Sequence, residues 1–169
     1  PEDPRDYEGR ILALWDEAHR EEKYLALGVA ERHHRFITIE AVPLYRRLIV
    51  EGAWWDLVDG VAANLVGGVL LNERPGMTPL VRRWLDDDVM WLRRTAIISQ
   101  LNHKAATDTA LLFDGCAARA HETEFFIRKA IGWALRQYAR TDPEAVRRFV
   151  ADQGDRLSGL SRREAMKHL

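Results

Sequence analysis

Apolar residues recur three and four positions apart along most of the chain, with charged residues between them. This spacing places the apolar side chains on one side of a helix. No run alternates between apolar and polar residues as a strand would, and the one short candidate, residues 35–40, leads directly into Pro43 and fits a first helical turn. The pattern therefore predicts an all-α protein of about eight helices joined by short loops, with strand content near zero.

Local signals predict where several helices begin and end. Thr141-Asp142-Pro143-Glu144 combines a capping box with a proline just inside a helix, which should end near Gly154. A second capping box, Ser161-Arg162-Arg163-Glu164, is predicted to open the last helix. Two further helix starts and one inter-helix loop are predicted at Thr78-Pro79, at Asp108 and over residues 72–77.

Several segments resemble one another at a regular interval. Trp91–Ala96 and Phe126–Ile131 share an aromatic, an aliphatic and two basic residues at an offset of 35, and Trp54–Asp59 lies 37 positions before Trp91. A repeat of about 35 to 40 residues made from helix pairs indicates a HEAT-like α-solenoid, whose second helices line a concave face. Three apolar helices of a plain bundle could produce a similar pattern, so a bundle is the alternative at this point.

Length and composition exclude several classes of protein. The 169 residues suit one compact domain over 1–169, and 47% hydrophobic with 30% charged residues exclude a disordered chain. No apolar run approaches the roughly 20 residues of a membrane helix, and the first residues lack a signal-peptide pattern, so no membrane partner is expected. The single cysteine, Cys116, suits a packed thiol in a reducing compartment, which predicts a cytoplasmic location.

The near-zero net charge hides a gradient. Residues 1–60 carry 8 Lys/Arg against 13 Asp/Glu, whereas residues 61–169 carry 17 against 13. All but four of the basic residues are arginine, which suits forked contacts to phosphate, although the base composition of a genome produces the same bias. The basic residues therefore lean towards the C-terminal part of the chain.

Three tryptophans each have a charged residue one helical turn away: the pairs are Trp55 and Asp59, Trp91 and Arg94, and Trp133 and Arg136. Stacked side by side, the helices that carry these pairs would present indole rings, one carboxylate and several guanidinium groups. A sugar–phosphate chain fits such a face. Five basic residues could contact its phosphates or simply form a solvated face: Arg93, Arg94, Arg128, Lys129 and Arg136.

Structural roles compete with these functional interpretations. Four of the six tryptophans are expected mainly to pack: Trp15, Trp54, Trp84 and Trp91. Asp56 and Asp59 fall in the first turns of a helix that should begin near Ala53, where carboxylates favour the helix dipole. The histidines lack the spacing of a zinc site, and Gly67-Gly68 belongs to an apolar helix rather than to a phosphate loop, so neither a metal nor a nucleotide cofactor is expected.

Four blocks of the chain carry a family resemblance: Trp54–Asp59, Trp91–Ile97, Glu124–Ala139 and Leu160–His168. Together they resemble the DNA alkylation repair glycosylases of the AlkD type over nearly the whole chain. The resemblance implies a HEAT-like fold whose concave basic face binds double-stranded DNA with alkylated purines. A monomer is expected. It further implies a base excision repair enzyme that hydrolyses the N-glycosidic bond of cationic N3- and N7-alkylpurines, leaves the lesion stacked rather than flipped and uses no cofactor.

Matching positions assign roles by that resemblance. Asp59 corresponds to the catalytic carboxylate, and Trp55 and Trp133 correspond to residues that line the sugar of the lesion nucleotide. Arg94 and Arg136 match the DNA-contacting surface, to which the basic pattern adds Arg128 and Lys129. The family's N-terminal helical segment, which supplies a further aromatic residue to the site, is expected to be missing ahead of Pro1.

The chemistry of such a reaction suits these residue types. A cationic alkylpurine leaves readily, so one carboxylate beneath C1′ can stabilise the developing oxocarbenium ion and orient a water without a general acid. Indole faces against the sugar add cation–π attraction as its positive charge grows. The alternative is a non-catalytic HEAT-like module that binds DNA or serves as a protein scaffold. A carboxylate in the middle of a phosphate-binding face favours the enzyme, because a pure DNA binder gains nothing from it.

Overall fold

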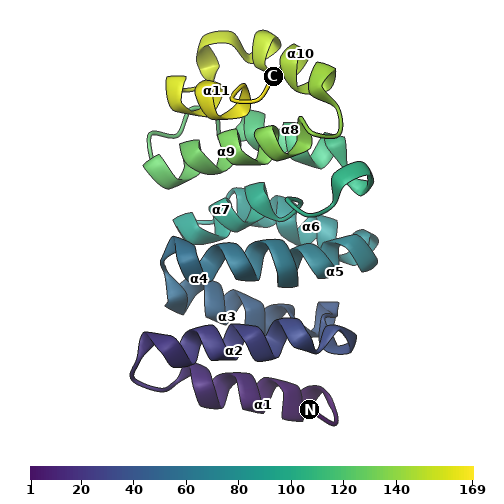
Figure 1. Ribbon diagram of the computed structural model, residues 1–169, viewed down its shortest axis with the longest axis vertical. Helices are drawn as coiled ribbons and strands as arrows, with labels where there is room; N and C mark the ends of the chain where they lie inside the picture. Colours follow the sequence, from purple (N-terminus) through teal and green to yellow (C-terminus); the bar gives the residue numbers. More distant parts are fainter.

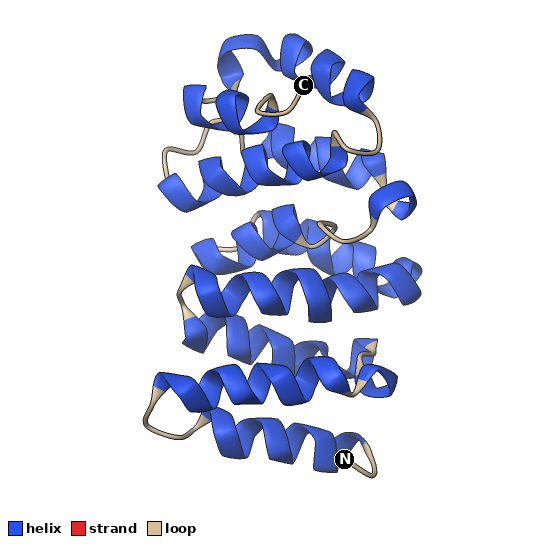
Figure 2. Cartoon of the chain, viewed as in Figure 1, coloured by secondary structure: helices blue, strands red, loops and turns tan.

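The computed structural model describes residues 1–169 and contains helices, turns and loops without a strand (Figure 2). This confirms the predicted all-α class. The α-helices are α1 (Pro4–Trp15), α2 (Arg20–Arg32), α3 (Val42–Gly52), α4 (Trp55–Gly60), α5 (Gly67–Asn72), α6 (Arg74–Leu85), α7 (Met90–Ile98), α8 (Thr109–Ala118), α9 (Phe125–Tyr138), α10 (Pro143–Gln153) and α11 (Gly159–Ala165). The predicted number of about eight helices was too low, because helices of six or seven residues hold too few apolar positions to show a period.

The helices stack in chain order along the long axis of the molecule, from α1 at one end to α10 and α11 at the other (Figure 1). One layer of this stack consists of α2, α4 with α5, α7, α9 and α11, and each of these contacts the next. We call it the second-helix layer. The other helices pack behind it, with α6 against both α7 and α8, and α10 against both α9 and α11.

Side-chain contacts reproduce the repeat seen in the sequence. Trp15 donates from its indole N–H to Glu51, 36 residues away, and Arg94 donates to Asp59, 35 residues away. Near the C-terminus the Ser161 hydroxyl donates to the carbonyl of Arg128, 33 residues away. Each contact joins one helix pair to the next, which confirms the predicted helical-repeat architecture.

A continuous core of 44 buried residues runs through the stack. Trp15 and Trp84 are buried in it, as predicted. Cys116 is also buried as a packed thiol, and burial raises its pKa to about 12. Trp54 is only partly covered, because 47% of its surface stays exposed. None of these helices combines the length and the apolar character that a membrane span requires.

Two predicted helix starts are confirmed. Asp108 caps α8 by accepting a hydrogen bond from the backbone N–H of Leu111. Asp142 caps α10 by accepting from Ala145, and Pro143 occupies the first turn. The helix ends at Gln153, and Gly154 follows it with a φ of +51°, a conformation that glycine adopts without steric cost.

Two other boundary predictions were wrong. Residues 72–77 do not form a loop, and Thr78-Pro79 does not start a helix, because α6 begins at Arg74 and Pro79 lies inside it. Pro75 stands in the first turn of α6, where no backbone donor is needed, so the proline marks a helix start rather than a loop. The last helix likewise begins before the proposed capping box, because Ser158 caps α11 through the N–H of Ser161.

α4 and α5 are the two ends of one continuous helical stretch, residues 55–72, joined by a wider π-helical segment, Val61–Val66. The π segment starts two residues after Asp59. Such wide turns inside helices occur frequently at functional sites. Further along, a Cβ on Gly67 would lie 2.4 Å from the carbonyl oxygen of Ser99, so a glycine there allows α5 to approach the end of α7.

Candidate active site

Asp59 lies near the end of α4 and faces α7, with 14% of its side chain exposed. Arg94 of α7 holds both carboxylate oxygens of Asp59. Its Nε donates to Oδ1 at 2.8 Å and its Nη2 donates to Oδ2 at 2.7 Å. Two parallel hydrogen bonds of this kind fix the plane of a carboxylate as well as its position. Asp59 is therefore a held, partly accessible carboxylate.

The remaining terminal nitrogen of Arg94 ties this pair to α9. Its Nη1 donates to the carbonyl oxygen of Phe126 at 2.6 Å, and the ring of Phe126 lies 5.8 Å from the guanidinium carbon. Only 3% of Arg94 is exposed. The sequence placed Arg94 on the DNA-contacting surface, but all three of its donor groups point into the protein. The geometry favours a positioning role for Arg94 in place of a phosphate contact.

An aromatic cluster adjoins this arginine. The ring of Phe126 lies 4.9 Å from that of Trp91 and 5.6 Å from that of Trp54, and the two indoles are 6.4 Å apart. These residues stand at the N-terminal ends of α4, α7 and α9, so the cluster joins the three helices beside the ion pair. The sequence predicted packing for Trp54 and Trp91. Both do pack here, although Trp54 keeps one side in solvent.

The two tryptophans assigned to the sugar differ in environment. Trp55 begins α4, one turn before Asp59, and is 48% exposed. Trp133 is half-buried against the core and lies seven residues, or two turns, beyond Phe126 on the same side of α9. Thus α4 and α9 each carry one of these indoles, and both helices contact α7, which carries Arg94.

Lys129 and Arg136 project from α9 towards one acidic residue of α11. Lys129 Nζ lies 2.9 Å from Oε1 of Glu164, and Arg136 Nη1 lies 2.5 Å from Oε2. The hydrogen bond from Lys129 lowers the pKa of Glu164, burial opposes this effect, and the charge of Arg136 adds to the lowering. Glu164 was not predicted as their partner, because the sequence pattern placed this residue in a capping box. The signal was available, since Glu164 stands 35 residues after Lys129, the same interval that separates Asp59 from Arg94.

Arg128 does not lie on the side of α9 that carries Trp133. It lines a separate cleft with His121 and Asp155. Successive helical residues differ by about 100°, so Arg128 points well away from Trp133. Arg93 also has a structural partner, because its guanidinium donates to the carboxylate of Glu122.

Asp56 and Asp59 are neighbours on α4 with different partners. Asp56 accepts hydrogen bonds from Arg20 and Tyr24 of α2, whereas Asp59 faces α7. Burial raises the pKa of Asp56, but the bonds from Tyr24 and Arg20 outweigh burial and lower it. Asp56 therefore joins two helices, and Asp59 is the carboxylate of this pair that lies beside Arg94 and the aromatic cluster.

No group of three or more His, Cys, Asp or Glu side chains is arranged to hold a metal ion. The arrangement instead provides a fixed carboxylate, exposed indole surface and nearby cations. These groups can bind a sugar and its phosphates and can stabilise a positive charge that develops between them.

The fold and this site together define an all-helical repeat protein with a carboxylate held among aromatic and basic side chains. A family model for the DNA alkylation repair enzyme matches residues 2–169, so the chain belongs to the DNA alkylation repair enzyme family. A solved structure described as a predicted DNA alkylation repair enzyme from Enterococcus faecalis is similar to it, with a TM-score of 0.90 and 30% sequence identity. That match covers 100% of this chain and 77% of the other. A search of curated proteins finds no match.

Proposed function

We propose that this chain is a DNA glycosylase of the AlkD type that hydrolyses the N-glycosidic bond of cationic N3- and N7-alkylpurines in double-stranded DNA. The observation that carries the proposal is the Asp59 carboxylate, held by Arg94 and one turn away from the exposed indole of Trp55. Membership of the DNA alkylation repair enzyme family supports DNA repair as the biological setting. A cytoplasmic monomer remains part of the proposal.

Asp59 carries the chemistry in this mechanism. As the alkylated purine departs, positive charge grows at C1′ of the deoxyribose, and a carboxylate aimed at that carbon stabilises it electrostatically. Each carboxylate oxygen has about two lone-pair sites, so the bond from Arg94 to each oxygen leaves a site that can accept from a water. That water then attacks C1′ and loses a proton to solvent, while the purine leaves as a neutral base with the electron pair of the N-glycosidic bond.

Trp55 and Trp133 flank the sugar in the proposed complex. Their ring faces attract the growing positive charge and exclude water from part of the sugar. The Trp55 ring is an exposed surface rather than the floor of a recess. An open site of this kind suits a lesion that stays stacked in the duplex, without the flipped-base pocket that many base-acting enzymes need.

The phosphates of the duplex are held by cations on the second-helix layer, which forms the concave face of the proposed HEAT-like solenoid. Lys129 and Arg136 lie on the same side of α9 as Trp133, and Glu164 holds them in place. In the complex these cations approach backbone phosphates near the lesion. We leave Arg94 out of this set because its donors are engaged by Asp59 and Phe126.

The proposal is tested by single-turnover release of free base from a duplex that carries one N7-methylguanine. Asp59→Asn keeps the size of the side chain and removes its charge, so base release should fall by roughly 10²–10³, the usual effect of losing one preorganised electrostatic contact. Binding to the duplex should hold or tighten, because a negative charge leaves a phosphate-facing surface.

Asp56→Asn is the matched control, because Asp56 lies three residues earlier on α4 and joins α2. Its base release should stay within a few-fold of the unsubstituted chain. Base release by a folded Asp59→Asn variant at the unsubstituted rate would reject the catalytic assignment. DNA binding without base release by the unsubstituted chain would favour a non-catalytic DNA-binding module.

A further inference from the structure

A cleft of about 190 Å³ opens between the C-terminal ends of α7 and α9, two neighbours in the second-helix layer. Its floor is apolar and includes Ile97, Leu112 and Ala134. Its rim is polar, and Lys104 and Arg140 are its only basic residues. Neither the carboxylate of Asp59 nor the acid that pairs with Lys129 and Arg136 takes part in it.

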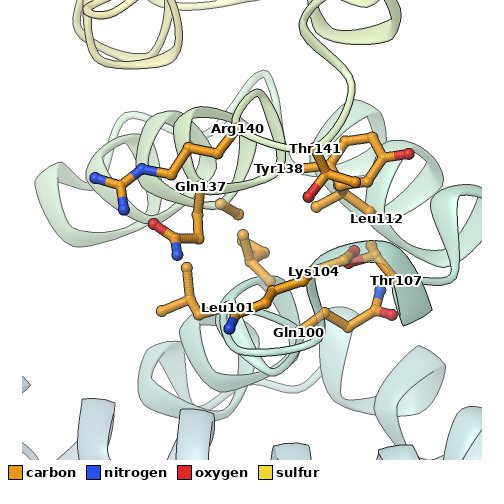
Figure 3. Close-up of a pocket in the computed structure, with 11 residues that line it drawn as sticks. Gln100, Leu101, Lys104, Thr107, Leu112, Gln137, Tyr138, Arg140 and Thr141 are labelled. Carbon is orange, nitrogen blue, oxygen red and sulfur yellow. The ribbon is translucent and has the colours of Figure 1, made fainter.

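The polar ends of three rim residues gather on one side of this cleft. In Figure 3 the guanidinium of Arg140, the amide of Gln137 and the ammonium of Lys104 end on the same side, whereas Tyr138 and Thr141 lie on the other. All three groups can donate hydrogen bonds. Three donor groups and two positive charges on one side of the cleft suit a phosphate group.

Lys104 and Arg140 also differ from most basic residues of the neighbouring surface in having no acidic partner. Lys129 and Arg136 are both paired with Glu164, and Arg93 is paired with Glu122, but Lys104 and Arg140 form no ion pair. Both side chains are exposed. An unpaired, exposed cation loses no internal ion pair when it meets an anion.

The backbone at Lys104 is unusual as well. Its φ is +52°, a left-handed conformation that is uncommon for residues other than glycine. The turn is held in place because Thr107 donates to the Lys104 carbonyl oxygen from both its N–H and its hydroxyl. Conformations of this kind persist where the surrounding structure imposes them, and they gather at binding sites.

The position of Arg140 relates this cleft to the candidate active site. Phe126, Trp133 and Arg140 are spaced by seven residues, so they follow one another along one side of α9 and the turn that continues it. Seven residues of helix span about 10 Å, and the phosphates of one DNA strand recur about every 3.4 Å along the duplex axis. The cleft thus lies within about three nucleotides of a sugar held at Trp133.

We propose that Lys104, Arg140 and Gln137 form a subsite for one backbone phosphate of double-stranded DNA, within about three nucleotides of the lesion. This subsite deepens the proposed function. Its distance from the lesion rests on the proposed function, but the phosphate contact itself does not require base release. Charge complementarity favours a DNA phosphate as the ligand, because Lys129 and Arg136 present further positive charge along the same helix, α9.

The test measures affinity for an undamaged duplex as a function of salt, with the Lys104→Ala, Arg140→Ala double variant. Loss of one phosphate contact should lower the slope of log K against log salt by about 0.9. At low salt the affinity should fall about tenfold, as expected for one charge-assisted contact, and the difference should shrink as salt rises. Lys104→Gln with Arg140→Gln provides a second variant should the alanine pair fold poorly.

Arg83→Ala is the matched control. Arg83 is another exposed arginine without an ion pair in the last turn of a helix, but its helix, α6, lies outside the second-helix layer. Cations near helix C-termini stabilise those ends, so both variants should lower the melting temperature slightly. If the double variant matches Arg83→Ala in affinity and slope, neither cation contacts a phosphate and the subsite is wrong.

A second measurement locates the phosphate. One neutral methylphosphonate is moved along a duplex that carries N7-methylguanine. A single position within about three nucleotides of the lesion should weaken binding of the unsubstituted chain but not of the double variant. Absence of any such position would overturn the subsite.

The last measurement is the binding of inorganic phosphate alone. If the double variant loses binding of inorganic phosphate while its DNA affinity and salt slope are unchanged, the cleft takes a free phosphate and the assignment to DNA is wrong. Conversely, a reduced salt slope in a chain that releases no base would keep the subsite and reject the glycosylase proposal, so the two failures are distinguishable.

Discussion

Arg94 reaches across from α7 and binds both oxygens of Asp59, at 2.8 and 2.7 Å, while its third nitrogen holds the carbonyl of Phe126. This one side chain fixes the carboxylate of α4 relative to α9. The arrangement separates two possible roles for a cation near a DNA site. A phosphate contact requires exposed donors, whereas a positioning residue has its donors satisfied within the protein, as Arg94 does.

The first prediction follows from that distinction. Arg94→Lys keeps a positive charge beside Asp59 but cannot make two parallel hydrogen bonds. A displacement of the carboxylate by about 1 Å costs on the order of 10² in rate, so single-turnover base release should fall by that factor. Affinity for undamaged duplex should stay within about twofold, because the buried guanidinium does not reach phosphate. A lower DNA affinity with an unchanged rate would instead assign Arg94 to phosphate contact.

Glu164 leads to a second prediction, about binding. Glu164→Gln removes the charge that holds Lys129 and Arg136, which leaves both cations without an ionised partner. Binding to undamaged duplex should tighten at low salt, and the salt slope should steepen by up to about 0.9 for each cation that meets a phosphate. The measurement is a salt titration of affinity.

Glu144→Gln is the control for that titration, because Glu144 pairs only with Arg147 on the surface of α10. Its salt slope should equal that of the unsubstituted chain. Weaker binding by Glu164→Gln would show that the acid is needed to hold the cations in their DNA-contacting positions.

The sequence was sufficient to predict the helical class, the repeat and much of the core, because these depend on a spacing that is visible in the chain. The same spacing paired Trp55 with Asp59, but it did not show that Asp59 meets Arg94 of α7 or that Asp56 meets α2. Which neighbour each side chain meets depends on how α4 is rotated between α2 and α7, and only the packed structure sets that rotation.

The ion pairs were hidden for a related reason. An exposed cation and a paired one have the same local sequence, so Lys129, Arg136 and Arg94 all appeared as phosphate contacts. The acids that pair with Arg94 and Lys129, namely Asp59 and Glu164, each lie one repeat away, at an interval of 35 residues. A search for opposite charges at the repeat interval would have found these pairs, whereas helix spacing alone could not.

His103 supports a prediction about pH. It is buried just after α7, its Nε2 lies 2.9 Å from the carbonyl of Gly67, and its Nδ1 has no partner. Burial lowers the pKa of His103, the hydrogen bond to Gly67 opposes that effect, and the nearby charge of Arg74 adds to the lowering. Below pH 6.5, the ordinary pKa of histidine, His103 therefore binds a proton more readily in the unfolded chain than in the folded chain.

Stability should accordingly be greatest above about pH 6.5 and should fall as the pH is lowered through the folded-state pKa of His103. His103→Gln removes this contribution. Its melting temperature should therefore change less between pH 7.5 and pH 5, a range that brackets the ordinary pKa of histidine, than that of the unsubstituted chain. The exposed His121→Gln should retain the full change. Identical pH profiles for all three proteins would exclude His103 as the source.

The close approach of α11 to α9 supports the last prediction. A Cβ on Gly132 would lie 2.5 Å from the Cβ of Glu164 and 2.9 Å from the carbonyl oxygen of Ser161. Gly132→Ala must therefore push α11 away, and overpacking of this kind costs about 1–3 kcal/mol in the free energy of unfolding. Gly28→Ala in the middle of α2 meets no atom within 4 Å and should instead stabilise the chain by about 0.5–1 kcal/mol. Urea titration of both variants measures the two effects, and equal stability would mean that α11 moves freely enough to make room for the methyl group.

The same substitution should also affect DNA binding. Because Glu164 moves with α11, Gly132→Ala should separate Glu164 from Lys129 and Arg136. The salt slope of DNA binding by Gly132→Ala should then shift in the same direction as that of Glu164→Gln.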